Sequence, residues 1–286
     1  MKSDGIKLLH GDETIQGRVR TENPGKQDFV IVTLKANLLD TFAEAAAPLL
    51  GPETAVVFAQ NGIPWWYSMG ARAPDLSILD PDGRLSRTFA RERIIGAVIY
   101  SANEVIEPGV VMNHVPGNNM LVVGEADDQQ TSRITRLRRA LEESGMSSPP
   151  APDIRAAIWS KLVQNLANST LTTLTGATVA QVRSDAALFA LSKKINEEGR
   201  AIAQAYGINL ALAPQRPGGG HAAGTPNHKP SMLQDYERGR PMEIASQLLV
   251  PLAFAKGANV SAPTLETVVP LVAWRAAQKG LFRPAA

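Results

Sequence analysis

The sequence predicts an α/β domain followed by an all-helical domain, and three observations lead to this prediction. Strand-like and helix-like segments alternate up to about residue 130, as in the β-α-β units of a parallel sheet. After Thr131 the apolar spacing becomes helical. A proline-rich segment at 147–152 separates the two halves and marks a domain boundary. We therefore expect one domain over residues 1–150 and a second over residues 151–286.

The first half is expected to contain buried parallel strands joined by a helix. Residues 29–34 form a continuous β-branched run, which is typical of an interior strand buried on both faces. Residues 38–50 have the apolar spacing of a helix that ends at Gly51, and residues 55–59 form a second buried strand before an Asn-Gly turn. Further strands are expected at 94–100, 110–115 and 120–123, where Pro-Gly turns favour antiparallel pairing.

Helices are expected through the second half. A charged amphipathic helix at 134–143 precedes the boundary, and Asp153 fits the N-cap of a long helix from 154 to about 173. A helix at 185–206 stops at Gly207, a loop rich in glycine, proline and histidine spans 214–229, and helices follow at 243–256 and 264–279.

Composition excludes several classes of protein. A formal charge of +2 gives no reason to expect a nucleic-acid partner or an anionic membrane partner. No apolar run approaches the ~20 residues of a membrane span, and the start lacks a signal-peptide pattern, so we expect a cytoplasmic protein. The chain has no cysteine, and only His221 and His228 are close in sequence among its four histidines, so no metal site is expected.

Two polar segments are the best candidates for a functional site. Residues 231–244 combine a hydroxyl, an amide, two arginines and three carboxylates, and a Gly-Arg-Pro break lets the groups before and after it face one space. Upstream, Lys161, Asn165 and Ser169 lie at i, i+4 and i+8 on one helical stripe. This stripe could be a solvated helix face. Trp159 and the scarcity of neighbouring charges favour burial, where a lone lysine is costly unless it has a use.

These segments resemble the signature sequences of the ketopantoate reductase (2-dehydropantoate 2-reductase) family. The matching runs are WSKL with Asn165, and SMLQD with Gly239, Arg240 and Glu243. Residues 32–36, a strand followed by Lys35, and residues 59–63, a Gln-Asn-Gly turn, also agree. The four motifs occur in one collinear order along essentially the whole chain, which makes the resemblance specific.

The resemblance implies a Rossmann-type cofactor domain and a helical domain like that of 6-phosphogluconate dehydrogenase-type enzymes. It also implies NADPH-dependent reduction of 2-dehydropantoate to pantoate, on the route to pantothenate and coenzyme A. The implied roles are Lys161 as general acid, Asn61, Asn165, Ser231 and Glu243 as substrate-binding groups, and Lys35 and Asn61 on the cofactor side, with NADP as cofactor and a small 2-oxo acid as substrate.

The sequence departs from the family pattern at its start. The family opens with a strand and a G-x-G-x-x-G turn, which this chain lacks, and the glycines at 218–220 follow no strand. The expected missing piece is one strand-helix-strand unit of roughly 30–45 residues. We therefore expect weak NADPH binding by these 286 residues, and self-association, for example as a homodimer, through an open apolar edge beside residues 29–34.

Two other functions remain open from the residues. The chain could be a non-catalytic family remnant that binds a small acid or a protein partner, or it could reduce another 2-oxo acid. Ser169 also stands where the family commonly has an asparagine, with Asn168 about 100° around the helix from it.

Overall fold

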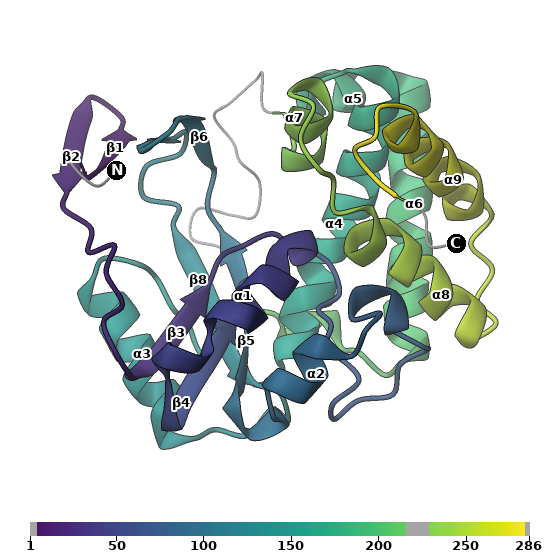
Figure 1. Ribbon diagram of the computed structural model, residues 1–286. Helices are drawn as coiled ribbons and strands as arrows, with labels where there is room; N and C mark the ends of the chain where they lie inside the picture. Colours follow the sequence, from purple (N-terminus) through teal and green to yellow (C-terminus); the bar gives the residue numbers. More distant parts are fainter. Residues whose placement is uncertain (1–4, 216–228, 284–286) are drawn as a thin grey trace.

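The computed structural model describes residues 5–215 and 229–283, which form an α/β part followed by a helical part (Figure 1). The main sheet has the order β3-β4-β5-β8. Strands β3 (Gln27–Val32), β4 (Leu50–Phe58) and β5 (Ile94–Tyr100) are parallel, and β8 (Met120–Glu125) is antiparallel to β5. A second sheet has the order β2-β1-β7-β6, from β1 (Ile6–His10), β2 (Glu13–Gly17), β6 (Asn103–Glu107) and β7 (Val110–Asn113). The predicted α/β-then-helical fold is confirmed.

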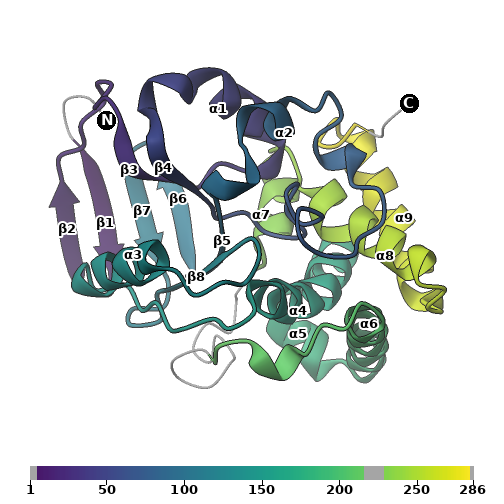
Figure 2. The ribbon, with the colours of Figure 1, turned by 90° about the horizontal axis from the view of Figure 1, so that it is seen from below.

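Helices cover both faces of the main sheet (Figure 2). Helices α1 (Leu39–Ala45) and α2 (Arg84–Thr88) lie on one side, and α3 (Ser132–Glu143) lies on the other. Side chains alternate along β4, so Ala55 and Val57 pack in the cluster that contains α3, whereas Val56 and Phe58 pack in the cluster that contains α1.

One detail of the predicted α/β part is wrong. The helix expected over 38–50 ends at Ala45, a 3₁₀ turn follows at Ala47–Leu49 (η2), and Leu50 already begins β4. Pro48 explains the break, because it has no N–H and disfavours helical geometry at the residue before it. The expected open edge beside residues 29–34 is present, because β3 is the edge strand of the main sheet in the described part of the chain, with Ile31 43% exposed.

The helical part is built around α4 (Ile154–Thr175). Around it lie α5 (Val179–Ser184), α6 (Ala186–Ala205), α7 (Ser231–Glu237), α8 (Val250–Gly257) and α9 (Pro263–Gln278). Further 3₁₀ turns occur at Ala36–Leu38 (η1), Ser77–Leu79 (η3), Arg91–Arg93 (η4) and Leu210–Leu212 (η5), and a π-helical turn, η6, spans Ala245–Leu249. The predicted N-cap is confirmed, since Asp153 accepts from the N–H groups of Arg155 and Ala156 at 2.8 and 3.0 Å. The glycines at 218–220, His221 and His228 lie outside the described residues.

Helix α4 is docked tightly onto the sheet through a pair of glycines. Gly96 on β5 lies opposite Gly124 on β8. A Cβ atom on Gly96 would lie 2.5 Å from the Trp66 ring, and one on Gly124 would lie 2.9 Å from Cβ of Ile154. The missing side chains therefore let the first turn of α4 approach the sheet, which fixes where residues further along this helix point.

Buried polar contacts hold the same end of α4. Arg155 is 3% exposed and pairs with Asp128 at 3.2 Å, and it donates to the carbonyl oxygens of Tyr67 and Ala126 at 3.1 and 2.8 Å. A buried arginine with these partners is costly to displace, so the helix start is held firmly to the sheet.

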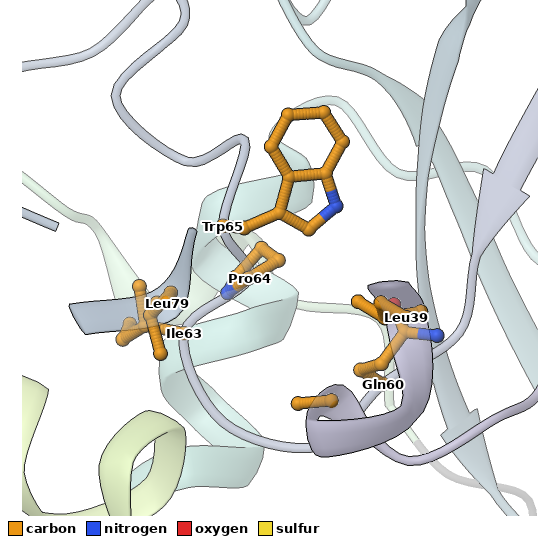
Figure 3. Close-up of a pocket in the computed structure, with 7 residues that line it drawn as sticks. Leu39, Gln60, Ile63, Pro64, Trp65 and Leu79 are labelled. Carbon is orange, nitrogen blue, oxygen red and sulfur yellow. The ribbon is translucent and has the colours of Figure 1, made fainter. Parts of the chain in front are cut away.

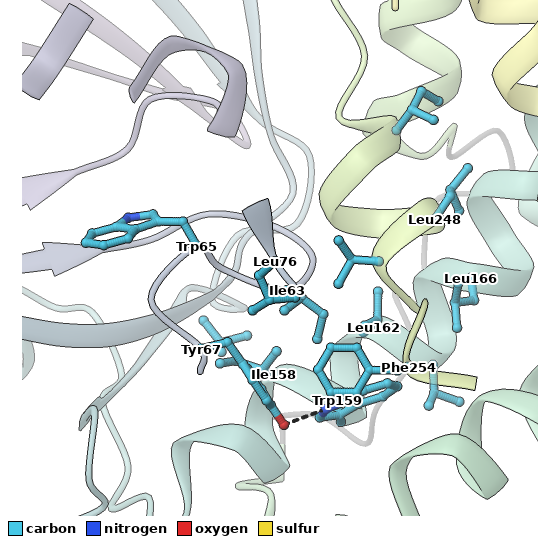
Figure 4. Close-up of a cluster of buried hydrophobic side chains, with 14 of the residues drawn as sticks. Ile63, Trp65, Tyr67, Leu76, Ile158, Trp159, Leu162, Leu166, Leu248 and Phe254 are labelled. Carbon is cyan, nitrogen blue, oxygen red and sulfur yellow. Dashed lines mark hydrogen bonds between the residues drawn. The ribbon is translucent and has the colours of Figure 1, made fainter. Parts of the chain in front are cut away.

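One continuous apolar core joins the two parts (Figure 4). Tyr67, from the loop after β4, packs edge-on against Phe254 of α8, with ring centroids 5.4 Å apart. Trp159 of α4 donates its Nε1–H to Tyr67 Oη at 2.9 Å, and burial raises the pKa of Tyr67 to about 12. The loop after β4 is therefore fixed relative to α4. Among the helices described, none is long and apolar enough to span a lipid bilayer.

Candidate active site

A polar network lies where the carboxyl ends of two parallel strands meet the helical part, and it consists of Lys35, Asn61, Lys161, Asp235 and Glu243. Lys35 and Asn61 each lie three residues beyond the last residue of their strand, Val32 of β3 and Phe58 of β4. Since Val32 and Phe58 are partners in the sheet, the two polar residues follow the same edge. Ligands of parallel α/β sheets bind outside the carboxyl ends of the strands.

Lys161 faces this edge from the third turn of α4. Its Nζ donates to Asn61 Oδ1 at 2.7 Å and to the carbonyl oxygen of Ile99. The ammonium also lies 5.4 Å from the centre of the Tyr100 ring, a distance suited to a cation–π contact. Tyr100 Oη in turn donates to the Ala157 carbonyl oxygen, one turn earlier on α4, at 3.3 Å. The charge of Lys161 is thus held in a half-buried place between the two parts of the molecule.

An apolar stripe on α4 explains this orientation. Ile154, Ile158, Leu162 and Leu166 are all buried, as expected for the core-facing side. Lys161 and Asn165, about 100° away on the helix, are half-buried, and Ser169 is buried. The alternative of a solvated helix face is wrong for this stripe.

Glu243 is the buried carboxylate of the network. It is 8% exposed, Oε1 accepts from the Ala36 N–H at 3.1 Å, and Oε2 accepts from Gln247 Nε2 at 3.2 Å. The Ala36 N–H begins a 3₁₀ turn just after Lys35, so the α/β part and the helical part both supply donors to this carboxylate.

Burial raises the pKa of Glu243 above its ordinary value. The Ala36 hydrogen bond and the charge of Lys35 act in the opposite direction, as does a hydrogen bond from the Asn61 side chain, while Asp235 raises the pKa further. Asn61 therefore contacts both Lys161 and Glu243.

Lys35 connects the sheet edge to α7. Its Nζ pairs with Asp235 Oδ2 at 2.5 Å and donates to the Pro241 carbonyl oxygen at 3.2 Å. Asp235 also pairs with Arg240 at 3.0 Å, and Arg238 pairs with Glu104 of β6. Arg238 and Arg240, on either side of Gly239, are thus ion-pair partners that hold this segment against its surroundings.

The structure does not bring every predicted residue into direct contact. Ser231 is the exposed first residue of α7, one turn before Asp235, and Asn165 is one turn after Lys161. The hydrogen bonds given above for Lys161 and Glu243 are made with Asn61, Ile99, Ala36 and Gln247. Both residues nevertheless lie on the helices that carry the network.

A small apolar recess adjoins this network (Figure 3). Its walls are formed by residues of η1, α1 and η3 and of the loop after β4, namely Ala36, Leu39, Gln60, Ile63, Pro64, Trp65 and Leu79. The recess shares Ala36 with the Glu243 contact. No group of three or more histidine, aspartate or glutamate residues in the described part of the chain could hold a metal ion.

Comparisons with known proteins agree on one family. The model described as "Ketopantoate reductase PanE/ApbA" matches residues 1–128, and its C-terminal counterpart matches residues 153–275. A 2-dehydropantoate 2-reductase from Mesorhizobium japonicum is 34% identical over 290 residues, 99% of this chain and 88% of that protein. The crystal structure of 2-dehydropantoate 2-reductase from Geobacter metallireducens GS-15 is 25% identical, with a TM-score of 0.76 over 95% of this chain and 87% of that one.

A dehydrogenase shares the same fold. A ternary structure of D-mandelate dehydrogenase with NADH and anilino(oxo)acetate has a TM-score of 0.79 at 17% identity, covering 98% of this chain and 88% of that chain. Fold and relatives together define an oxidoreductase of the nicotinamide-dependent class, with a Rossmann-type domain and a helical domain. Within that class the chain belongs to the ketopantoate reductase family.

Proposed function

We propose that this protein reduces 2-dehydropantoate to pantoate with NADPH, a step towards pantothenate and coenzyme A. The observation that carries the proposal is the ammonium of Lys161, held 2.7 Å from Asn61 at the carboxyl edge of the parallel strands. The names of the relatives from Mesorhizobium japonicum and Geobacter metallireducens support the same substrate.

Lys161 is the proposed general acid. Reduction of a ketone places negative charge on its oxygen, which an ammonium stabilises and then neutralises by proton transfer. The contacts to Asn61 and the Ile99 carbonyl oxygen fix the ammonium before substrate arrives, and preorganised charge of this kind costs little reorganisation during the reaction.

Glu243 is the proposed acceptor for the substrate hydroxyl. Donors approach both of its oxygens, yet a carboxylate offers about four lone-pair directions and can accept further hydrogen bonds. Ser231 and Asn165 are proposed to donate to the substrate carboxylate. Each is one helical turn from a residue of the network, Asp235 or Lys161.

The cofactor is proposed to approach Lys35 and Asn61. NADPH supplies the hydride when bound. Asn61 carries an amide at the strand edge, and the ammonium of Lys35, which pairs with Asp235, lies at the same edge. These two residues suit the nicotinamide end of the cofactor, whereas the 286 residues contain no strand followed by a G-x-G-x-x-G turn for its pyrophosphate. We also propose that the domain boundary lies in the proline-rich segment, giving domains of residues 1–150 and 151–286.

The test is an assay of NADPH oxidation by the purified protein with a panel of 2-oxo acids. The product is identified by mass spectrometry. We expect the highest kcat/KM with 2-dehydropantoate. A higher kcat/KM with a 2-oxo acid that has no hydroxyl group would show that 2-dehydropantoate is not the preferred substrate. Absence of turnover, together with binding of the acids, would favour a non-catalytic family member.

A further inference from the structure

The helical turn after Glu243 has an unusual hydrogen-bond pattern. In η6 the N–H of Val250 bonds to the carbonyl oxygen of Ala245, five residues earlier. The residue five positions after Ser246 is Pro251, which has no N–H, so the Ser246 carbonyl oxygen cannot continue this pattern. It accepts instead from the N–H of Ile63 at 2.9 Å.

The hydrogen bond from Ile63 to Ser246 attaches the Asn-Gly loop to the helical part. Gly62 has φ +82°, and a Cβ atom there would lie 2.5 Å from the carbonyl carbon and oxygen of Ser246. The loop that carries Asn61 therefore lies directly on the π turn. π turns of this kind occur frequently at functional sites, because they redirect carbonyl groups and side chains.

Gln247 is the polar side chain that this turn directs towards the network. It is 2% exposed, and its Nε2 donates to Glu243 Oε2 at 3.2 Å. Its neighbour in the turn, Leu248, is fully buried in the apolar core. An amide buried among such residues is costly unless it is hydrogen-bonded, so its contact with the Glu243 carboxylate accounts for its presence.

We propose that Gln247 is a positioning residue that fixes the Glu243 carboxylate for recognition of the substrate hydroxyl. Ala36 holds one carboxylate oxygen and Gln247 holds the other, and Asn61 also donates to this group, so the carboxylate cannot rotate without breaking hydrogen bonds. This inference rests on the proposed function, in which Glu243 accepts from the hydroxyl group of 2-dehydropantoate.

The electrostatic surroundings supply a measurable consequence. The charged groups that act on Glu243 are Lys35, at the end of β3, and Asp235, on α7, and Asn61 links it to Lys161 on α4. The Gln247 amide donates to the ionised form of Glu243, so removing it raises the pKa of Glu243.

The experiment compares Gln247→Met, which has a similar length but no donor, with wild type and with Gln204→Met on the exposed side of α6. In the full-length protein, KM for 2-dehydropantoate should rise about tenfold while kcat stays within about threefold, as for loss of a hydrogen bond to a charged group. A ¹³C NMR titration, assigned with Glu243→Gln, should show a higher pKa for Glu243 in Gln247→Met only.

The two readouts separate this proposal from the proposed function. An unchanged KM and an unchanged Glu243 titration would overturn the role of Gln247 even if the enzyme is active. If wild type reduces no 2-oxo acid, the proposed function fails, and the NMR titration still decides whether Gln247 holds Glu243. Should Gln247→Met not fold, Gln247→Glu keeps the size and polarity and should raise the pKa of Glu243. An unchanged pKa of Glu243 in Gln247→Glu would refute the contact between the two side chains.

Discussion

Replacing Lys161 with methionine removes the ammonium while keeping most of the buried side-chain volume. We expect kcat to fall by ~10²–10⁴ with 2-dehydropantoate, the range for loss of a general acid. The estimate follows from the contacts of Lys161. An ammonium fixed by Asn61 and the Ile99 carbonyl oxygen can make a charged hydrogen bond of ~1.5–3 kcal/mol to the developing alkoxide, which alone corresponds to about 10- to 150-fold. Loss of proton transfer accounts for the remainder.

The assay is steady-state NADPH oxidation by the full-length protein, with Lys194→Met on exposed α6 as the matched control. Because the interaction belongs to the transition state, kcat and kcat/KM should fall together, with little change in KM. Circular dichroism checks that Lys161→Met folds. Turnover within about threefold of wild type, in a folded variant, would refute the assignment of Lys161 as general acid.

Four further predictions test other parts of the structure. Glu243→Ala should raise KM by an amount worth ~1.5–3 kcal/mol, and unchanged kinetics would make Glu243 structural. Because burial raises the pKa of Glu243, its contribution to folding is fully present below the unfolded value of 4.5 and is lost as pH rises through the higher folded pKa. Glu243→Gln should therefore gain stability over wild type at neutral pH but not at pH below 4.5, measured by urea unfolding; an equal difference at both pH values would contradict this. Gly62→Ala should lower the free energy of unfolding by ~1–3 kcal/mol and reduce kcat, since its Cβ would clash with Ser246; wild-type stability would show that the loop can move aside. The exposed β3 edge predicts self-association of the 286-residue chain, which Ile31→Lys should weaken in analytical ultracentrifugation, and an unaltered association constant would point to another surface.

The strands and helices that could be predicted are those whose burial leaves a pattern in the sequence. The runs in β4 and β5 are almost fully buried, and α4 carries both an apolar stripe and an N-cap at Asp153. Strands β1, β2 and β6 are largely exposed or half-buried, so their residues show no continuous apolar run or strict alternation. Their position depends on pairing between distant segments, such as the parallel pairing of β1 with β7.

The candidate site could be predicted only where side chains, rather than backbone groups, form it. Spacing on α4 and the scarcity of neighbouring charges indicated that the stripe with Lys161 is buried, and the motif resemblance indicated Asn61 and Glu243. The backbone partners, the Ala36 N–H and the Ile99 carbonyl oxygen, could not be found this way because any residue type supplies them. Gln247 also lacked a signal, since nothing in the sequence distinguishes an amide that faces a carboxylate from one that faces solvent.

Lys161, Glu243 and Lys35 each bond to the other part of the molecule. Lys161 of the helical part contacts Asn61 of the α/β part, Glu243 accepts from Ala36, and Lys35 pairs with Asp235. Neither part alone therefore completes the site, and docking of the two parts creates it. The same polar groups that would receive a substrate are satisfied by one another across this junction, so substrate binding must exchange protein–protein hydrogen bonds for protein–substrate ones. Such an exchange favours a ligand that carries a hydroxyl, because a ligand without one offers nothing in return for a hydrogen bond that the buried Glu243 gives up, at a cost of ~1–3 kcal/mol.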